Sequence, residues 1–116
     1  MPQITVDYSA DLRDAFDRRG YATALHPVVV AAVAARPEAC KTRIRPVEEY
    51  AVGDGTGRDA VVHVEIALAA GRTGEAKDRL ARAAAALVRE HLAPVDGLTV
   101  HVSAEVRDLA PAYRTA

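Results

Sequence analysis

The stretch AVVHVEIALA, residues 60–69, has the clearest structural pattern in this sequence. Apolar side chains alternate along it with more polar ones, and His63 and Glu65 share one parity. Alternation with a period of two residues is typical of a strand that turns one face toward a core. We therefore predict a strand here, whose apolar face consists of Val62, Val64, Ile66 and Leu68.

A helix and a further strand follow this stretch. Thr73 is a suitable N-cap residue, and Glu75 stands in the first turn, where the helix dipole favours an acidic side chain. Pro94 and Gly97 stop the helix, and alternation over residues 98–107 predicts a strand. The apolar stripe of the helix follows helical spacing through Leu80, Ala83, Ala84, Leu87, Val88 and His91.

The N-terminal half repeats this order of elements. Residues 2–8 alternate like a strand, with Ser9 or Asp11 expected to cap the helix that follows. Residues 40–45 alternate again, and Pro46 is expected to end or bend this strand. Two β-α-β units therefore follow one another, each with parallel end strands. The strands have one apolar face, so the helices are expected to cover that face alone in an α+β fold.

The first helical segment, residues 12–35, is less regular than the second. Gly20 weakens a helix, while Pro27 lacks a backbone N–H and disfavours a helical residue before it. We therefore predict two short helices, or one kinked helix, ending near residues 36–37.

Length and composition limit the class of protein. The 116 residues are expected to form a single domain, residues 1–116. A net charge of −1, with both signs mixed along the chain, argues against a nucleic-acid partner. The single cysteine, Cys40, excludes an intrachain disulfide and a cysteine-based zinc site. The chain has no run of about 18 apolar residues, so no membrane span is predicted. Charged residues among the first twenty argue against a secretory signal, so we expect a cytoplasmic protein.

Pro2 directly follows the initiator methionine. Methionine before so small a residue is normally removed, which leaves a secondary amine whose reference pKa is about 8. Pro2 lies on the same strand face as the apolar residues Ile4 and Val6, so its amine is expected to be partly desolvated. Desolvation and nearby cations both disfavour the protonated amine. Such an amine suits a general base acting on a carbon acid beside a carbonyl group. Many chains begin with Met-Pro without a catalytic role, so this feature alone leaves both interpretations open.

Three basic residues, Lys41, Arg43 and Arg45, share one face of the second predicted strand. Like charges on one face repel unless an anion lies nearby. A bound carboxylate is one explanation, because arginine pairs with carboxylates bidentately. Pairing with Glu65, Glu105 or solvent is the other.

Other polar residues have both a functional and a structural interpretation. Arg72 follows a strand end and precedes a helix, which is a frequent place for ligand contacts but also for ordinary loop arginines. His63, Glu65 and His101 lie on polar strand faces; a metal site needs at least three convergent ligands, so a hydrated or interface face is favoured. Cys40 has no partner pattern and is interpreted as a structural thiol.

Taken together, these segments resemble the 5-carboxymethyl-2-hydroxymuconate delta-isomerase family of the tautomerase superfamily. The resemblance runs from Pro2 to about Tyr113 and is strongest in VHVEIALAAGR, with the helix after it, and in SAEVRDLAP. It implies two β-α-β units packed into one four-stranded sheet, subunits assembled as a homotrimer, and no metal or cofactor.

The resemblance also implies how a site would work. The processed Pro2 would take a proton from one carbon of an unsaturated keto or enol acid and return it at another, while arginines hold the carboxylates. Lys41 stands nearest the family's leading arginine and Arg43 follows two residues later, so Arg43 is the first choice, with Lys41 and Arg45 as alternatives. Arg72 corresponds to the family's arginine after glycine.

We therefore predict a cofactor-free isomerase for an unsaturated 2-hydroxy or 2-oxo carboxylic acid, with 5-carboxymethyl-2-hydroxymuconate from aromatic-acid breakdown as the expected substrate. One alternative is a keto–enol tautomerase of another 2-oxo acid, such as an aryl pyruvate. The other is a non-catalytic trimeric binding protein, which the lysine at position 41 keeps open.

Overall fold

The structure is a computed structural model that describes residues 1–116. Two β-α-β units follow one another along the chain, as the alternation predicts. Two short 3₁₀ helices, at Ala10–Leu12 and Pro37–Ala39, lie between the main elements. The main elements are β1 (Gln3–Ser9), α1 (Arg18–Val33), β2 (Lys41–Val47), β3 (Asp59–Leu68), α2 (Gly74–Glu90) and β4 (Thr99–Asp108).

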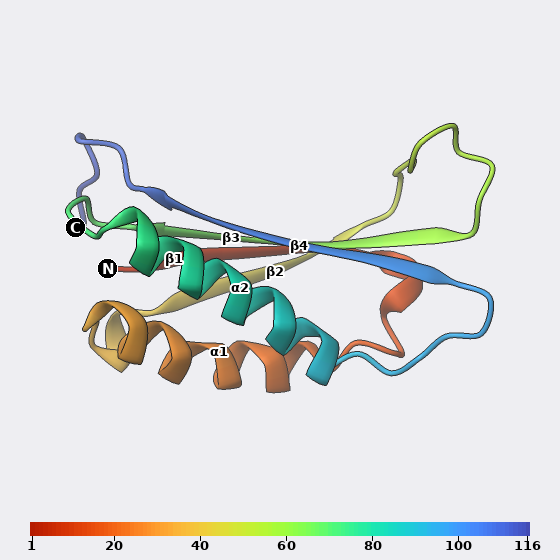
Figure 1. Cartoon of the computed structure of the whole chain (residues 1–116), viewed down its shortest axis with the longest axis horizontal. Coiled ribbons are helices and arrows are strands. Elements are labelled where there is room, and N and C mark those ends of the chain that lie inside the picture. The colour runs from red at the N-terminus through yellow and green to blue at the C-terminus, as the bar shows by residue number, and fades with distance from the viewer.

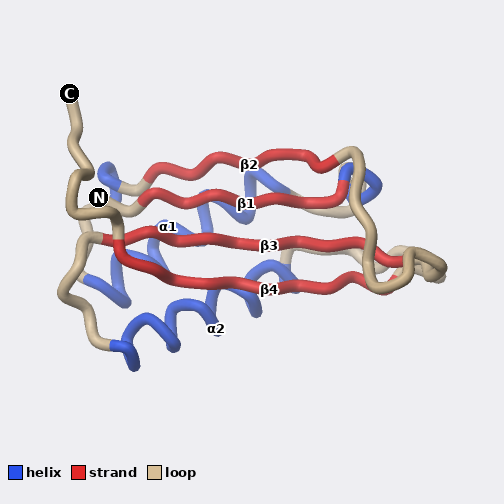
Figure 2. The backbone as a smooth tube through the Cα atoms, turned by 90° about the horizontal axis from the view of Figure 1, so that it is seen from above, coloured by secondary structure: helices blue, strands red, loops and turns tan.

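The four strands form one mixed sheet in the order β2-β1-β3-β4. Each β-α-β unit contributes a parallel pair, and the two units join through the antiparallel pair of β1 and β3. Both helices lie on the same face of the sheet, and the other face has no helix over it (Figures 1 and 2). The predicted α+β class and its one-sided helix layer are confirmed.

The core fills the space between the sheet and the two helices. Alternate residues of β1 and β3 are buried there, and they pack against one face of each helix. Burying one such aliphatic side chain contributes about 1.5–3 kcal/mol, so the alternation fixes which face of each strand turns inward. The residues at its centre include Ile4, Val6, Val62, Val64, Ile66, Leu25, Val29, Leu80, Ala84 and Val88.

The first helical segment is a single helix, one of the two predicted alternatives, but it begins at Arg18 and ends at Val33 instead of running from residue 12 to residues 36–37. Both Gly20 and Pro27 lie inside this helix, α1. Its cap is Asp17, whose carboxylate accepts a hydrogen bond from the Gly20 N–H at 3.1 Å, so the prediction of Ser9 or Asp11 was wrong. Pro27 is exposed, and its missing N–H costs less than the burial that holds the inner face of the helix. That face consists of Tyr21, Leu25, Val29 and Val33.

Pro46 does not end its strand. β2 runs through Pro46 to Val47, because β2 is an edge strand and a residue there can lack a backbone donor on its outer side. Ser9 makes a long-range contact instead of a cap, as its hydroxyl accepts from the Val61 N–H at 2.8 Å. No helix is long and apolar enough to cross a membrane.

Candidate functional site

Pro2 lies at one end of the sheet, where both chain termini are found (Figure 1). It is buried, as its shared parity with Ile4 and Val6 predicts. Its carbonyl oxygen accepts a hydrogen bond from the Lys41 N–H at 3.2 Å, which ties the first residue of β2 to the start of β1. Cys40, next to Lys41, is also buried, and burial raises the pKa of its thiol.

A hollow of about 270 Å³ opens beside this end of the sheet. Its walls come from the end of β3 and from the segment after β4, which are joined by a hydrogen bond from the Leu109 N–H to the Leu68 carbonyl. Almost every lining residue is apolar. They are Met1, Ala69, Ala70, Leu109, Ala110, Pro111 and Tyr113.

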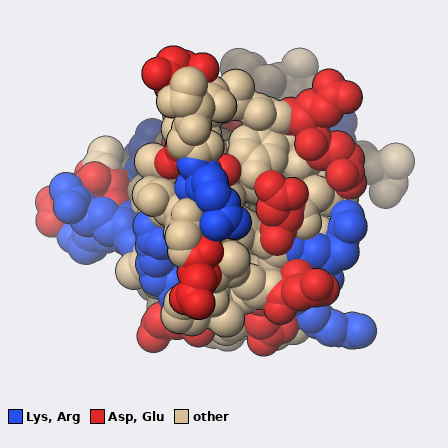
Figure 3. Space-filling view, turned by 90° about the vertical axis from the view of Figure 1, so that its right-hand side faces the viewer, with Lys and Arg blue, Asp and Glu red and all other residues tan.

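A larger hollow, of about 530 Å³, lies at the opposite end of the sheet. Acidic and basic side chains are intermixed over this end (Figure 3). Tyr50 donates to Asp11 at 2.7 Å, which raises the pKa of the Tyr50 hydroxyl. Asp59 accepts from the His101 ring at 2.8 Å. Tyr50, Asp11 and Asp59 therefore have partners, whereas the side chain of Arg58, which also lines this hollow, donates only to the Asp96 carbonyl, at 3.4 Å.

The strand register arranges the open face of the sheet in rows of four residues. A rise of about 3.3 Å per residue separates the Cα atoms of Pro2 and Asp7 by roughly 17 Å. The predicted basic residues thus stand at increasing distances from Pro2. From the Pro2 end inward, the rows are Lys41, Gln3, Ala67 and Arg107; then Arg43, Thr5, Glu65 and Glu105; then Arg45, Asp7, His63 and Ser103.

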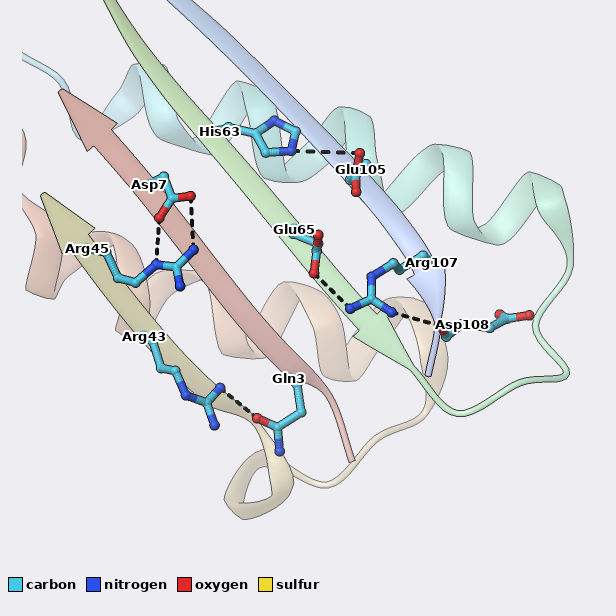
Figure 4. A network of polar contacts seen from close by, with 9 residues as sticks. All are labelled: Gln3, Asp7, Arg43, Arg45, His63, Glu65, Glu105, Arg107 and Asp108. Atoms are coloured by element: carbon cyan, nitrogen blue, oxygen red, sulfur yellow. Dashed lines mark hydrogen bonds and ion pairs between the residues drawn. The ribbon is translucent and has the colours of Figure 1, made fainter. Parts of the chain in front are cut away.

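Two basic residues of β2, Lys41 in the first row and Arg43 in the second, lie at the Pro2 end of the open face. Arg43 Nη1 donates to the Gln3 side-chain oxygen at 2.7 Å, so the guanidinium reaches back toward the start of β1 (Figure 4). Lys41 Nζ lies 3.4 Å from the carbonyl of Ala39. Neither side chain forms an ion pair with a carboxylate. Both cations therefore retain donors for an acid.

The other basic residues of this face, Arg107 in the first row and Arg45 in the third, are neutralised by carboxylates. Arg45 binds both carboxylate oxygens of Asp7, at 2.8 and 3.1 Å, which raises the pKa of Arg45. Arg107 pairs with Glu65 at 3.0 Å, and His63 lies 3.7 Å from Glu105 (Figure 4). Pairing within the sheet therefore accounts for Arg45, through Asp7 rather than through Glu65 or Glu105.

Arg72 lies between β3 and α2 and is half-buried. It donates to the Ala69 carbonyl at 3.1 Å and to the Val33 carbonyl at 2.9 Å. Val33 ends α1, where backbone carbonyls lack partners inside the helix. Arg72 thus joins one wall of the smaller hollow to the end of α1.

Two residues that sequence reasoning missed also lie here. Gln3 follows Pro2 directly, and its amide nitrogen donates to the Tyr113 hydroxyl at 3.0 Å. Gln3 carries only a weak signal, its place beside Pro2, and the segment around Tyr113 has no periodic pattern. No group of three or more His, Cys, Asp or Glu side chains is arranged to hold a metal ion.

Comparison with known proteins agrees with this architecture. A family model for 5-carboxymethyl-2-hydroxymuconate isomerase matches residues 2–115. A solved 5-carboxymethyl-2-hydroxymuconate isomerase from Deinococcus radiodurans R1 is 25% identical to this chain, with a TM-score of 0.80, covering 99% of this chain and 87% of its own. A second solved structure, a 5-carboxymethyl-2-hydroxymuconate delta-isomerase, is 19% identical, with a TM-score of 0.82 and coverage of 100% and 87%.

A third similar structure is the W0 fused 4-OT wild type symmetric trimer. It is 17% identical to this chain, with a TM-score of 0.73, covering 98% of this chain and 92% of its own. A search of curated protein sequences gives no match.

Proposed function

This chain belongs to the 5-carboxymethyl-2-hydroxymuconate isomerase family and is an isomerase, and we propose that it uses Pro2 as a general base to move a proton and a double bond in an unsaturated 2-hydroxy or 2-oxo carboxylic acid. The expected substrate is 5-carboxymethyl-2-hydroxymuconate, and residues 1–116 act as one domain without a cofactor. The observation that carries this proposal is the place of Pro2, which is buried beside an apolar hollow and two cations without carboxylate partners.

The base requires removal of Met1. While Met1 is attached, the Pro2 nitrogen is an amide and has no basic lone pair. Met1 also lines the smaller hollow, so its removal would leave a secondary amine at that wall. Burial and the nearby cations Lys41 and Arg43 both favour the neutral form of such an amine. The pyrrolidine ring would hold the lone pair in one direction.

The substrate's carboxylate would bind Arg43 first, with Lys41 as the second cation. Arg43 uses one donor for Gln3 and keeps the others for an acid. Arg72 would also bind the substrate, as the resemblance implies, while its hydrogen bonds to the Ala69 and Val33 carbonyls hold it in place. Arg45 remains the more distant alternative.

With a 2-oxo acid, the Pro2 amine would take a proton from one carbon, the C–H electron pair would shift along the conjugated system, and the same proton would return at another carbon. With a 2-hydroxy acid, the amine would take the 2-hydroxyl proton, the O–H electron pair would form the 2-oxo group, the double bonds would shift, and the proton would be returned at a conjugated carbon. The product is an isomer of the substrate, so no co-reactant is consumed.

We also propose a homotrimer. β2 and β4 are edge strands with unpaired backbone groups, and edges of this kind are usually covered. A structure with the same fold is a symmetric trimer. Sedimentation would give about three times the chain mass of 12.3 kDa, whereas a clean monomer would contradict this proposal.

One observation favours the second candidate, a keto–enol tautomerase of another 2-oxo acid. The smaller hollow is lined almost wholly by apolar side chains, which suits an acid with an apolar group better than one with several carboxylates.

The test joins intact mass with turnover. We expect the mass of the mature chain to lack methionine, and 5-carboxymethyl-2-hydroxymuconate to lose its ultraviolet absorbance on addition of the protein. Turnover of aryl pyruvate enols alone would select the second candidate. Retention of Met1 in the chain's own host would contradict the general-base proposal. So would a processed chain that turns over neither 5-carboxymethyl-2-hydroxymuconate nor the aryl pyruvate enols.

A further inference from the structure

Three polar side chains cross the Pro2 end of the sheet as one series of hydrogen bonds. Arg43 Nη1 donates to Gln3 Oε1 at 2.7 Å. Gln3 Nε2 donates to the Tyr113 hydroxyl at 3.0 Å. The three residues come from β2, from β1 and from the segment after β4, so only the folded chain brings them together.

The direction of this series follows from the chemistry of its first member. A guanidinium has donors only, so the Gln3 amide must turn its oxygen toward Arg43. The amide NH₂ then faces Tyr113, and the Tyr113 oxygen must accept. The hydroxyl hydrogen of Tyr113 is therefore directed away from Gln3, and no protein acceptor takes it.

Tyr113 is also the one residue with a hydroxyl, amide or charged side chain among those that line the smaller hollow. In a mostly apolar pocket, a few polar groups fix the orientation of a bound molecule. A hydroxyl with a free hydrogen at this wall can hold an oxygen atom of a ligand. The positive charge of Arg43 at the start of the series polarises each following bond and strengthens the last donor.

We propose that Tyr113 contacts the substrate and donates a hydrogen bond to its 2-hydroxy or 2-oxo oxygen, and that Gln3 is the positioning residue that holds Tyr113 as a donor. The identity of the acid rests on the proposed function. When Pro2 takes a proton from a carbon of a 2-oxo acid, or from the hydroxyl of a 2-hydroxy acid, negative charge develops on that oxygen, and a fixed donor there stabilises the transition state.

Two variants test the direction of the series. Tyr113→Phe keeps the ring at the wall and removes the donor. Gln3→Glu keeps the shape of residue 3 but replaces its NH₂ by oxygen; the carboxylate would accept from both Arg43 and Tyr113, so the tyrosine hydrogen would turn back. Tyr50→Phe removes a hydroxyl at the opposite end of the sheet and serves as the matched control.

With 5-carboxymethyl-2-hydroxymuconate, we expect both Tyr113→Phe and Gln3→Glu to lower kcat about tenfold, which is the size of one lost hydrogen bond. The melting temperature of Gln3→Glu should hold or rise, because the change adds an ion pair to Arg43. The new carboxylate also pairs with Arg43 and weakens acid binding there, so KM should rise in Gln3→Glu but not in Tyr113→Phe. An unchanged kcat in either variant would overturn the proposal.

A binding experiment distinguishes the proposed roles of Tyr113 and Gln3 from the role of Pro2. The probes are 2-oxoadipate and adipate, which differ only in the 2-oxo oxygen, titrated by NMR against the processed chain. We expect wild type, Tyr50→Phe and Pro2→Ala to prefer 2-oxoadipate, and Tyr113→Phe and Gln3→Glu to lose about tenfold of that preference. The proposal would be overturned if wild type showed no preference for 2-oxoadipate over adipate, or if Tyr113→Phe kept the full preference. It would also be overturned if Tyr113→Phe lost the preference but Gln3→Glu kept it. Full turnover by Pro2→Ala would instead contradict the general base and leave the binding contrast intact.

Discussion

The two ends of the sheet each carry a hollow, and the larger one is not the one beside Pro2. The far hollow measures about 530 Å³, against about 270 Å³ at the Pro2 end. At the far end, Asp11 binds Tyr50 and Asp59 binds His101. At the Pro2 end, Lys41 and Arg43 have no carboxylate partner. Size therefore does not locate the candidate site. Arg58 at the far hollow also lacks a carboxylate partner, so free cationic donors alone do not locate it either; Pro2 and the hydrogen bonds that join Arg43, Gln3 and Tyr113 lie only at the end with the smaller hollow.

The physical reason is the state of the polar groups before a ligand arrives. A ligand that bound Asp11, Tyr50 or Asp59 at the far end would have to displace hydrogen bonds that already exist. A carboxylate at the Pro2 end would meet donors that have no competing anion, and hydrogen bonds to charged groups are worth about 1.5–3 kcal/mol. This difference between the ends can be tested by changing each in turn.

The largest effect is expected from Pro2→Ala. The new terminus keeps an amine but loses the ring, and general base catalysis contributes about 10²–10⁴-fold, so kcat should fall about a hundredfold. Steady-state turnover of 5-carboxymethyl-2-hydroxymuconate measures it, and Tyr50→Phe at the far end should keep wild-type turnover. Equal turnover in Pro2→Ala and wild type would remove the distinction between the two ends.

The next largest effect is a difference in KM between variants of Arg43 and Arg45, two arginines of β2. Arg43→Ala should raise KM about tenfold, because it removes a charged partner of the substrate's carboxylate. Arg45→Ala should change KM less than about twofold, since Asp7 already occupies Arg45 and an exposed pair contributes little. The reverse order, measured on the same substrate, would move the acid-binding role along β2.

A third effect concerns the wall of the smaller hollow. Arg72→Ala should lower the free energy of unfolding by about 1.5 kcal/mol, because two backbone carbonyls lose their donor. Arg79→Ala, which breaks only an exposed pair with Glu75, should cost about 0.3–0.5 kcal/mol. Urea unfolding curves measure both, and equal losses would mean that Arg72 is an ordinary surface arginine.

The smallest effect lies at the far end and depends on pH. The hydrogen bond to Asp11 raises the pKa of Tyr50. A raised pKa means that the contribution of Tyr50 to stability is complete below the unfolded tyrosine value of about 10 and is lost as pH rises through the higher folded value. Ultraviolet titration of wild type minus Tyr50→Phe isolates this group, and Asp11→Asn should bring its pKa down. A Tyr50 that titrates like free tyrosine in wild type would show that the far-end pair does not persist.

Local pattern predicted most of the fold because the strands alternate clearly and α2 has one apolar stripe. It was ambiguous for α1, where local rules at Gly20 and Pro27 left two short helices or one kinked helix open, and it placed the bounds and the cap of α1 wrongly. The buried face of α1 outweighs those rules, since the burial of several side chains exceeds the cost of one missing N–H. The choice of Asp17 as cap follows from where that face begins.

The residues of the candidate site also divide into those that local pattern predicts and those that only long-range contacts bring together. Pro2, Lys41 and Arg43 are visible in the sequence, because parity and charge are local properties of a strand. The pairing of Arg45 with Asp7 depends on the register between β1 and β2 and has no local signal. Gln3 and Tyr113 are 110 residues apart and meet only because the segment after β4 returns to the start of β1.

By itself, the sequence determined the β-α-β order, the inward face of each strand and the residue types at the Pro2 end. Only the tertiary structure decided which charges are already paired, which cations keep free donors and which way the Gln3 amide points. The reason is that periodicity acts between neighbours along the chain, whereas neutralisation and hydrogen-bond direction depend on strand register and on contacts between distant segments.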